Sequence, residues 1–330
     1  ENIKMKILLI AENPAGPFGG IERHCYNICK MFYTSEVEVQ MASIESIENR
    51  TIFNKRFFKK KSLKQTIIDS NCDIVHVHGF ANFTVWQSLL VALNVRKKVV
   101  YTPHFHPFSA LEKPVLGRLF FYVLLRPLLF KISTIVCINH EDFNFFSRYN
   151  KSTVLLPNWL FRNSSTVNVV ERKKNMILFV GRNDSNKSPD YLLELPQNKY
   201  EIHCVTNDST NLRNDFIIHN KLSDSELLKL YFQASLLVVP SRYEAFSYVV
   251  LEALNCGTPV LVSNRVRIVD HLQNVSGYTV FPYGDKSAFV ASIDKAMNVK
   301  VDIDAITNIF SEKKIQKSLY DIYKKVSSSQ

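Results

Sequence analysis

Two glutamates eight residues apart, Glu244 and Glu252, mark the segment of this chain whose residue types point most clearly to chemistry. Glu244 follows a short apolar run, and Glu252 lies two turns into the next apolar run, near the same helix face. A carboxylate between Leu251 and Ala253 needs a partner, because burying it without a hydrogen bond is strongly destabilising. Ribose hydroxyl groups can supply that partner; a buried structural ion pair is the alternative.

A second segment with chemical potential, Gly181 to Ser188, follows the apolar run 177–180. Arg182 and Lys187 stand five residues apart on one expected loop and can close on a diphosphate from two sides. Two such cations stabilise the charge that develops on a departing nucleotide diphosphate. A solvated basic loop is the alternative interpretation.

A third segment places Gly19 and Gly20 between an apolar run and a helical pattern. Small residues there let backbone N–H groups and the helix dipole approach a phosphate, which indicates a donor-binding role. A tight strand-to-helix turn without any ligand is the alternative.

The elements that position these residues follow a repeating order. Short β-branched runs alternate with helical patterns, and strands that are apolar on both faces are typical of parallel sheets covered by helices. The sequence therefore predicts an α/β protein with two doubly wound, Rossmann-like halves whose parallel sheets face an interdomain cleft. The predicted strands are 6–11, 37–42, 73–77, 98–102, 134–138 and 153–156, then 176–180, 200–205, 216–218, 236–239, 259–262 and 278–281.

The domain boundary is expected at a polar linker, 162–175, which gives an acceptor domain at 1–160 and a donor domain at 161–311. Helices are expected at 223–233 and 247–254. A closing helix is expected at about 304–326, and its part from about 312 to 330 is predicted to pack back on the first domain.

Taken together, the Gly-rich first turn, the Gly-Arg-x4-Lys loop and the Glu-x7-Glu motif resemble the retaining glycosyltransferases of the GT-B fold, family 4, also called glycosyl transferases group 1. Ala253-x3-Gly257-x-Pro259-Val260 adds to the resemblance, which runs from about Lys6 to about Asp285. It implies a hexosyltransferase that uses a nucleotide-diphosphate sugar in cell-surface polysaccharide or glycoconjugate synthesis.

The resemblance also implies roles for particular residues. Arg182 and Lys187 would hold the donor diphosphate and Glu252 the ribose. The sugar and phosphate would be contacted by Glu244, by the backbone of Phe246, Ser247 and Tyr248, and by the segment with Gly19, Gly20 and Gly181. His104, after the strand 98–102, would reach the sugar, and Asn158 would mark the crossover between domains.

Histidines near strand ends also serve as hydrogen-bonded structural residues, and this alternative applies to His104, His78 and His106. The catalytic candidates are therefore His104, Glu244, Arg182 and Lys187.

Three positions depart from the family pattern. Trp159 stands where Gly is usual, Ser188 replaces the Gly that usually follows the lysine, and the segment 263–270 carries Arg265 and Arg267 in place of Gly-Gly and Pro-Glu. Either arginine can substitute electrostatically at the donor phosphates.

The charge distribution indicates the acceptor side. Residues 1–160 hold 20 Lys and Arg against 12 Asp and Glu, whereas residues 161–330 hold 21 against 18. The segment 53–61 interleaves aromatic and basic residues, and 118–126 is an apolar helix with cationic ends. Both are typical of docking on an anionic membrane, and a glycan or polyprenyl-diphosphate-linked glycan is the expected acceptor. A solvated basic face on a core helix is the alternative.

The chain has no apolar run of the length that spans a bilayer, so we expect a cytoplasmic protein, either free or peripheral on the inner membrane face. Neither an Asp-x-Asp cluster nor a His/Cys set with ligand spacing occurs, so no metal or other cofactor is expected. The rival interpretations are a nucleotide-sugar epimerase of the same fold, a catalytically inactive relative, and a nucleic-acid-binding protein. The last lacks a recognisable binding module.

Overall fold

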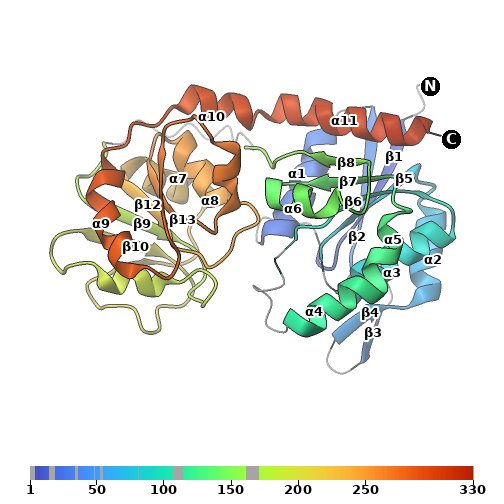
Figure 1. Ribbon diagram of the computed structural model, residues 1–330, viewed down its shortest axis with the longest axis horizontal. Helices are drawn as coiled ribbons and strands as arrows, with labels where there is room; N and C mark the ends of the chain where they lie inside the picture. Colours follow the sequence, from blue (N-terminus) through green and yellow to red (C-terminus); the bar gives the residue numbers. More distant parts are fainter. Residues whose placement is uncertain are drawn as a thin grey trace. The chain divides into compact units, whose positions relative to one another are not determined.

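The computed structural model describes residues 4–14, 19–33, 36–47, 49–52, 55–80, 82–105, 107, 114–160 and 171–329, with the backbone alone at 49–52 and 55–57. Two compact units make up the chain (Figure 1), namely residues 1–159 with 312–330, and residues 160–311. The first boundary lies one residue before the predicted one.

The N-terminal unit is built on a parallel sheet with the strand order β2-β1-β5-β6-β7-β8. Its strands are β1 (Met5–Ile10), β2 (Val37–Ala42), β5 (Ile74–His78), β6 (Lys98–Thr102), β7 (Thr134–Cys137) and β8 (Thr153–Leu155). Its helices are α1 (Gly20–Phe32), α2 (Lys60–Asp69), α3 (Phe83–Asn94), α4 (Pro114–Phe120), α5 (Arg126–Leu129), α6 (His140–Phe146) and α11 (Glu312–Ser328), with a π-helical turn, η2 (Phe121–Leu125), between α4 and α5.

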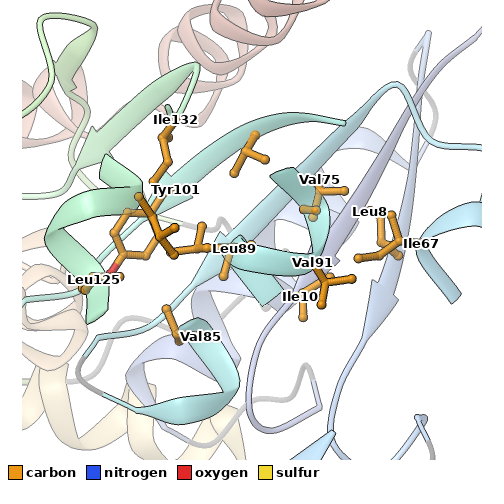
Figure 2. Packing of buried hydrophobic residues seen from close by; sticks show 14 of the residues in the cluster. Leu8, Ile10, Ile67, Val75, Val85, Leu89, Val91, Tyr101, Leu125 and Ile132 are labelled. Carbon is orange, nitrogen blue, oxygen red and sulfur yellow. The ribbon is translucent and has the colours of Figure 1, made fainter. Parts of the chain in front are cut away.

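Alternation along β1 divides this unit into two cores. Leu8 and Ile10 face a cluster formed with α2, α3, α5 and α6, whereas Ile7 and Leu9 face a cluster formed with α1 and α11. Figure 2 shows the first of these cores, where Leu89 and Val91 of α3 pack near the strand residues. Burial on both faces explains why the strand reads as a continuous apolar run.

The C-terminal unit has a second parallel sheet, ordered β11-β10-β9-β12-β13-β14. Its strands are β9 (Met176–Val180), β10 (Glu201–Val205), β11 (Ile217–His219), β12 (Leu236–Val239), β13 (Val260–Ser263) and β14 (Tyr278–Phe281). Its helices are α7 (Asp224–Gln233), α8 (Tyr248–Asn255), α9 (Lys286–Met297) and α10 (Ile303–Ile309), with 3-10 turns η3 (Pro189–Glu194) and η4 (Arg267–His271). The two sheets of six parallel strands confirm the predicted α/β class.

One prediction about an individual element was wrong. The closing helix expected at about 304–326 is two helices, α10 and α11, because the chain leaves the helical conformation at Phe310, whose buried ring packs edge-on against Phe246. The basic segment 53–61 stays a predicted docking segment, and the structure describes its secondary structure in part. An antiparallel hairpin of β3 (Asn49–Ile52) and β4 (Lys55–Phe58) contains part of it, and Phe58 is fully buried in the core. Residues 53 and 54 lie outside the described part.

The apolar stretch 119–130 is helical through Arg126 and Pro127, up to Leu129. A widened turn precedes the proline: the Arg126 N–H donates to the Phe121 carbonyl, five residues back. Proline has no N–H to donate, and the wider turn accommodates its ring. Among the described residues, no helix is long and apolar enough to cross a membrane.

Candidate functional site

Three loops of the C-terminal unit follow the carboxyl ends of adjacent strands. Residues 181–188 follow β9, residues 240–247 follow β12, and residues 264–267 follow β13. Because the carboxyl ends of parallel strands lie at one edge of a sheet, these loops meet there, where open α/β sheets bind ligands.

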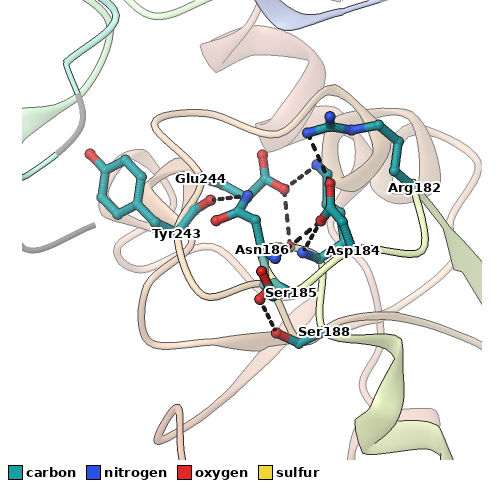
Figure 3. Close-up of polar contacts among 9 residues, drawn as sticks. Arg182, Asp184, Ser185, Asn186, Ser188, Tyr243 and Glu244 are labelled. Atoms are coloured by element: carbon teal, nitrogen blue, oxygen red, sulfur yellow. Dashed lines mark hydrogen bonds and ion pairs between the residues drawn. The ribbon is translucent and has the colours of Figure 1, made fainter. Parts of the chain in front are cut away.

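The loop 181–188 is organised by Asp184, as Figure 3 shows. Its Oδ1 accepts hydrogen bonds from the backbone N–H groups of Asn186, at 3.1 Å, and Lys187, at 2.9 Å. The other carboxylate oxygen, Oδ2, lies 3.1 Å from Nη2 of Arg182. Asp184 therefore fixes the backbone that carries Lys187, a role that the sequence interpretation did not assign.

Lys187 and Glu244 form an ion pair between the first two loops, and their side chains are only 22% and 14% exposed. Ser241 donates to the same Glu244 oxygen, Oε1, at 3.0 Å. Gly181 lies against both Phe179 and the lysine stem, since a Cβ there would lie 3.3 Å from Cζ of Phe179 and 3.4 Å from Cγ of Lys187. Lys187 and Glu244, both predicted from the sequence as site residues, thus form an ion pair that Ser241 helps to fix.

Hydrogen bonds join the three loops, three of them between backbone groups and one from a side-chain amide. The Asn186 side-chain amide donates to the Tyr243 carbonyl at 3.2 Å (Figure 3), and the Arg242 N–H donates to the Asn186 carbonyl at 2.7 Å. Glu244 bridges onward, since its N–H donates to the Arg265 carbonyl at 3.1 Å and its carbonyl accepts from the Arg267 N–H at 2.9 Å. Glu244 is therefore fixed at both its backbone and its carboxylate.

Arg182 contrasts with Lys187, because its side chain is 76% exposed and its recorded ion pair is with Asp184 on the same loop. Its guanidinium can reorient at low cost, and water screens its charge.

The loop 240–247 leads into the N-terminus of α8. Ser247 is the N-cap residue, yet its side chain accepts no capping hydrogen bond. Its hydroxyl is buried and has no hydrogen-bond partner among the described residues. Phe246 is buried too, and its ring packs at 5.7 Å from Tyr248. A helix N-terminus with an unused hydroxyl suits an anionic ligand.

Glu252 lies on α8 and is half-buried, and its Oε2 accepts a hydrogen bond from the Tyr231 hydroxyl at 3.0 Å. Tyr231 is itself fixed, since its carbonyl accepts from the Thr258 hydroxyl at 2.5 Å. The sequence left a buried ion pair as the alternative for Glu252, and the partner at Oε2 is instead the neutral Tyr231 hydroxyl. The role of Glu252 at the ribose stays a prediction.

Two of the departures from the family pattern have a local explanation. Ser188 has a φ of 51°, in the left-handed region that glycine adopts most easily. This backbone conformation explains why glycine is usual at this position of the family pattern. Arg267 bonds the Asn264 carbonyl at 3.2 Å and lies 3.9 Å from Asp270, whereas Arg265 is exposed. Of the two candidate substitutes, Arg265 is the more accessible.

In the N-terminal unit, Gly19 is the N-cap of α1 and has a φ of 88°. A Cβ there would lie 2.1 Å from Oε2 of Glu22, so a carboxylate already lies against this turn. Gly20 has open space around it. A phosphate at this turn has to displace Glu22, and residues 15–18 lie outside the described part.

Four histidines gather near the ends of β5 and β6. His76 is structural, as its ring nitrogens lie 2.7 Å from the Tyr323 hydroxyl and 2.8 Å from the Thr102 hydroxyl. His78, His104 and His24 are buried, and His104 has a φ of 46°. Burial lowers the pKa of His24 to about 4 and that of His78 well below its usual value. His106 lies outside the described residues.

Next to these histidines, Trp159 is 1% exposed and its ring lies edge-on to His24 at 5.4 Å. The tryptophan fills the core formed by α1 and α11, which accounts for a large residue in place of glycine. Asn158 is also buried.

Asp142, on α6, was missed by the sequence interpretation. Its carboxyl is fully buried, which raises its pKa to about 8, and its Oδ2 accepts from the Phe105 N–H at 3.2 Å. It thereby anchors the backbone next to His104. An acidic residue just after Asn139 reads from sequence as a common helix start, so no signal singled it out.

Comparison with known proteins gives this arrangement a context. Residues 161–308 match the family model of glycosyl transferases group 1. A Klebsiella pneumoniae protein described as an uncharacterized 41.2 kDa protein in a cps region is 26% identical over 79% of this chain and 81% of its own length. An uncharacterized glycosyltransferase of Methanocaldococcus jannaschii is 33% identical over 34% of this chain and 33% of its own length.

Solved structures of the same fold cover nearly the whole chain. Sucrose-phosphate synthase of Thermosynechococcus elongatus has a TM-score of 0.75 at 16% identity, covering 99% of this chain and 100% of that one. Anabaena HepE, solved in complex with UDP and glucose, has a TM-score of 0.71 at 14% identity, covering 98% and 100%. At these identities the likeness establishes the two-unit fold, and the roles of individual side chains stay predictions.

Proposed function

We propose that this chain, whose residues 161–308 match the family model of glycosyl transferases group 1, moves a hexose from a nucleotide-diphosphate sugar to a glycan or lipid-linked glycan, with retention of configuration. That it is a glycosyltransferase follows from the family; the donor, the stereochemistry and the acceptor are the proposal. The observation that carries it is the Lys187–Glu244 pair, held between loops at the carboxyl edge of the sheet.

The donor diphosphate is assigned to Lys187, Arg182 and the N-terminus of α8. A diphosphate carries more negative charge than one carboxylate, so it competes with Glu244 for the Lys187 ammonium. The unused Ser247 hydroxyl and the backbone N–H groups at the start of α8 add donors without net charge. HepE, a structural neighbour, is described in complex with UDP-glucose, which supports a nucleotide sugar here.

Transfer then needs positioning and charge stabilisation more than a protein nucleophile. The leaving phosphate takes the proton of the acceptor hydroxyl on the same face as the bond that breaks, while the two cations stabilise the negative charge left on the diphosphate. These cations supply the charge that a metal supplies elsewhere, so the proposal includes no metal at the diphosphate. His104, fixed through the anchored Phe105 backbone, is assigned to the transferred sugar.

Thermal unfolding with a panel of nucleotide diphosphates and nucleotide sugars in EDTA tests the donor site. A ligand at 100 times its dissociation constant adds about 2.7 kcal/mol of stability, which gives a clear shift. We expect one nucleotide diphosphate to stabilise the wild type and to lose this effect in Lys187→Ala and Glu252→Ala. The matched control is Lys199→Ala, which removes another lysine of the same unit, paired with Asp294. If no ligand stabilises the wild type, the donor assignment is wrong.

Product analysis separates transfer from the rival epimerase. A transferase releases free nucleotide diphosphate as the sugar moves to the acceptor, whereas an epimerase returns an intact nucleotide sugar. Retention is read from the anomeric configuration of the product.

For the acceptor side, we propose docking of the N-terminal unit on an anionic membrane through residues 114–131. Val115, Leu119, Val123 and Phe130 are 79%, 59%, 58% and 62% exposed on this helical segment. The exposed cations Arg118, Arg126 and Lys131 accompany them. Apolar side chains with cationic neighbours favour the headgroup region of anionic lipid, at about 1 kcal/mol per basic residue.

Sedimentation with vesicles tests this docking. We expect binding to vesicles containing phosphatidylglycerol, weak binding to phosphatidylcholine alone, and a loss of binding in Leu119→Ser/Val123→Ser. The control is Ile303→Ser, which removes an apolar side chain that is 41% exposed in the other unit. Equal binding by the double variant contradicts the proposal.

A further inference from the structure

The side chain of Tyr231 reaches Glu252, the residue predicted to hold the donor ribose, from a neighbouring helix. Tyr231 lies near the end of α7, and Glu252 lies on α8. The tyrosine hydroxyl donates a hydrogen bond to Oε2 of the glutamate at 3.0 Å. The tyrosine is 1% exposed, whereas the glutamate is half-buried, so a buried donor holds an acceptor that is partly open to solvent.

Tyr231 is itself held in place by residues from other parts of the C-terminal unit. Its carbonyl accepts a hydrogen bond at 2.5 Å from the hydroxyl of Thr258, which is fully buried. Nη2 of Arg172 donates to the same threonine oxygen at 3.2 Å, and its Nη1 donates to the Gly257 carbonyl at 2.8 Å. Consecutive hydrogen bonds thus connect Arg172 to Glu252 through the tyrosine, and members of such a chain restrict one another's movement.

The place of Glu252 on α8 suits a nucleotide that lies along this helix. The glutamate stands five residues beyond Ser247, the N-cap residue, which places its backbone about 7 Å further along the helix axis. The ribose of a nucleotide is attached directly to the diphosphate, so a diphosphate at the N-terminus of α8 brings the ribose toward Glu252. A carboxylate accepts up to about four hydrogen bonds, so the bond from Tyr231 is compatible with further bonds from ribose hydroxyl groups.

The bond between Tyr231 and Glu252 has a structural and a functional interpretation. A buried tyrosine hydroxyl needs a hydrogen-bond partner, and the glutamate supplies one whether or not a ligand binds. A neutral acceptor serves that need with a smaller desolvation cost than a carboxylate. A glutamate side chain has several rotatable bonds, and ordering it only when the ligand arrives weakens binding, whereas a tyrosine that fixes it beforehand removes this loss. The functional interpretation therefore explains why the partner is an acid.

We propose that Tyr231 is a positioning residue for the donor ribose. Its hydroxyl fixes the Glu252 carboxylate in the orientation that accepts the ribose hydroxyl groups, and Thr258 and Arg172 hold the tyrosine in place. The inference rests on the proposed function, because it needs a nucleotide donor at the carboxyl edge of the C-terminal sheet. It adds to that function a residue that acts on the ribose through Glu252.

Calorimetric titration of the full chain with paired nucleotides tests the proposal. UDP, GDP and ADP are each compared with their 2′,3′-dideoxy counterparts, so that the ratio of the two affinities measures recognition of the ribose hydroxyl groups alone. We expect the wild type to prefer the ribonucleotide and Glu252→Ala to lose this preference. Tyr231→Phe should lower the preference about two- to tenfold, which is the loss expected when one side chain has to be ordered on binding. Its affinity for the dideoxy nucleotide should equal that of the wild type.

The matched control is Tyr200→Phe, which removes another tyrosine hydroxyl of the same unit, one that donates to Asp294 at 2.7 Å. This variant should keep the wild-type preference for the ribonucleotide. Phenylalanine retains the buried ring at position 231, and circular dichroism establishes that Tyr231→Phe folds.

The outcomes separate this inference from the proposed function. If Tyr231→Phe keeps the wild-type preference, or binds both nucleotides of a pair more weakly by the same factor, the tyrosine is structural and the inference is overturned. A wild type that binds a nucleotide without preferring its ribose hydroxyl groups also overturns the inference, while the diphosphate site stands. If none of the nucleotides binds the wild type, the proposed function fails and the inference fails with it.

Discussion

The two units place their candidate functional groups in opposite physical settings. In the C-terminal unit, Arg182, Lys187 and Glu244 are charged and stand on loops that keep contact with water. In the N-terminal unit, His78 and Asp142 are at most 1% exposed. Burial lowers the pKa of His78 and raises that of Asp142, and both shifts favour the neutral form of the side chain. A charged site needs partners but not burial, whereas a buried site has to stay neutral or take up a counter-charge.

The difference teaches which unit should respond to which perturbation. Removing the exposed charge of Arg182 in the C-terminal unit should reduce function and leave stability nearly unchanged, because water screens that charge and backbone hydrogen bonds hold the loops. Changing pH should act mainly on the stability of the N-terminal unit, because its buried groups titrate differently once the unit unfolds.

The largest expected effect is the pH dependence caused by Asp142. Its pKa is raised from 3.8 to about 8 in the folded protein, so the folded state binds more protons than the unfolded state between these values. Stability from this group is present below about pH 4 and is lost as pH rises toward 8, by up to about 5 kcal/mol. Asp142→Asn should flatten this slope in urea unfolding measured from pH 4 to 8.

Asp321→Asn is the control for that measurement, since it removes an exposed carboxylate of the same unit. An unchanged slope in Asp142→Asn would show that the carboxyl is solvated, and the comparison between units would fail.

Next in size is the effect of Lys187→Ala on transfer. Removing the cation that is already held in place should lower kcat/KM at least about a hundredfold, or roughly 3 kcal/mol. Steady-state kinetics with the donor found by thermal shift measures this, and Lys199→Ala should behave like the wild type. A variant within twofold of the wild type contradicts a role at the diphosphate.

Arg182→Ala should have a smaller effect, about tenfold in kcat/KM, because the guanidinium is 76% exposed and is screened by water. The same kinetic assay at low and high salt sharpens the comparison: the Arg182 contribution should shrink with salt more than that of Lys187. A larger loss of kcat/KM in Arg182→Ala than in Lys187→Ala would contradict this order and would mean that Arg182 is the main cation at the diphosphate once the donor is bound.

The smallest expected effect concerns Ser188. Ser188→Ala and Ser188→Gly both lose the hydroxyl that donates to the Ser185 carbonyl at 3.0 Å, but only glycine relieves the φ of 51°. We expect the glycine variant to be more stable than the alanine variant by about 1 kcal/mol in urea unfolding. Equal stability would mean that the loop relaxes on substitution.

Local sequence pattern predicted most of the sheet strands closely. The bounds 37–42, 98–102, 176–180, 236–239 and 278–281 agree with β2, β6, β9, β12 and β14, because a strand buried on both faces is a short apolar run between polar turns. The hairpin at 49–58 was missed, since its residues alternate weakly and include Asn49 and Lys55. The break at Phe310 was missed because it depends on a packing partner, Phe246, far away in the chain.

The sequence by itself determined the fold class and the loops that carry Arg182, Lys187 and Glu244, because motif spacing and short-range periodicity are local properties of the chain. Only the tertiary structure decided that His24 lies beside His78 and His104, that Asp142 anchors Phe105, and that Tyr231 serves Glu252. These contacts depend on strand order and on which helix covers which sheet face, and side chains that are distant in sequence meet only once the sheets have assembled.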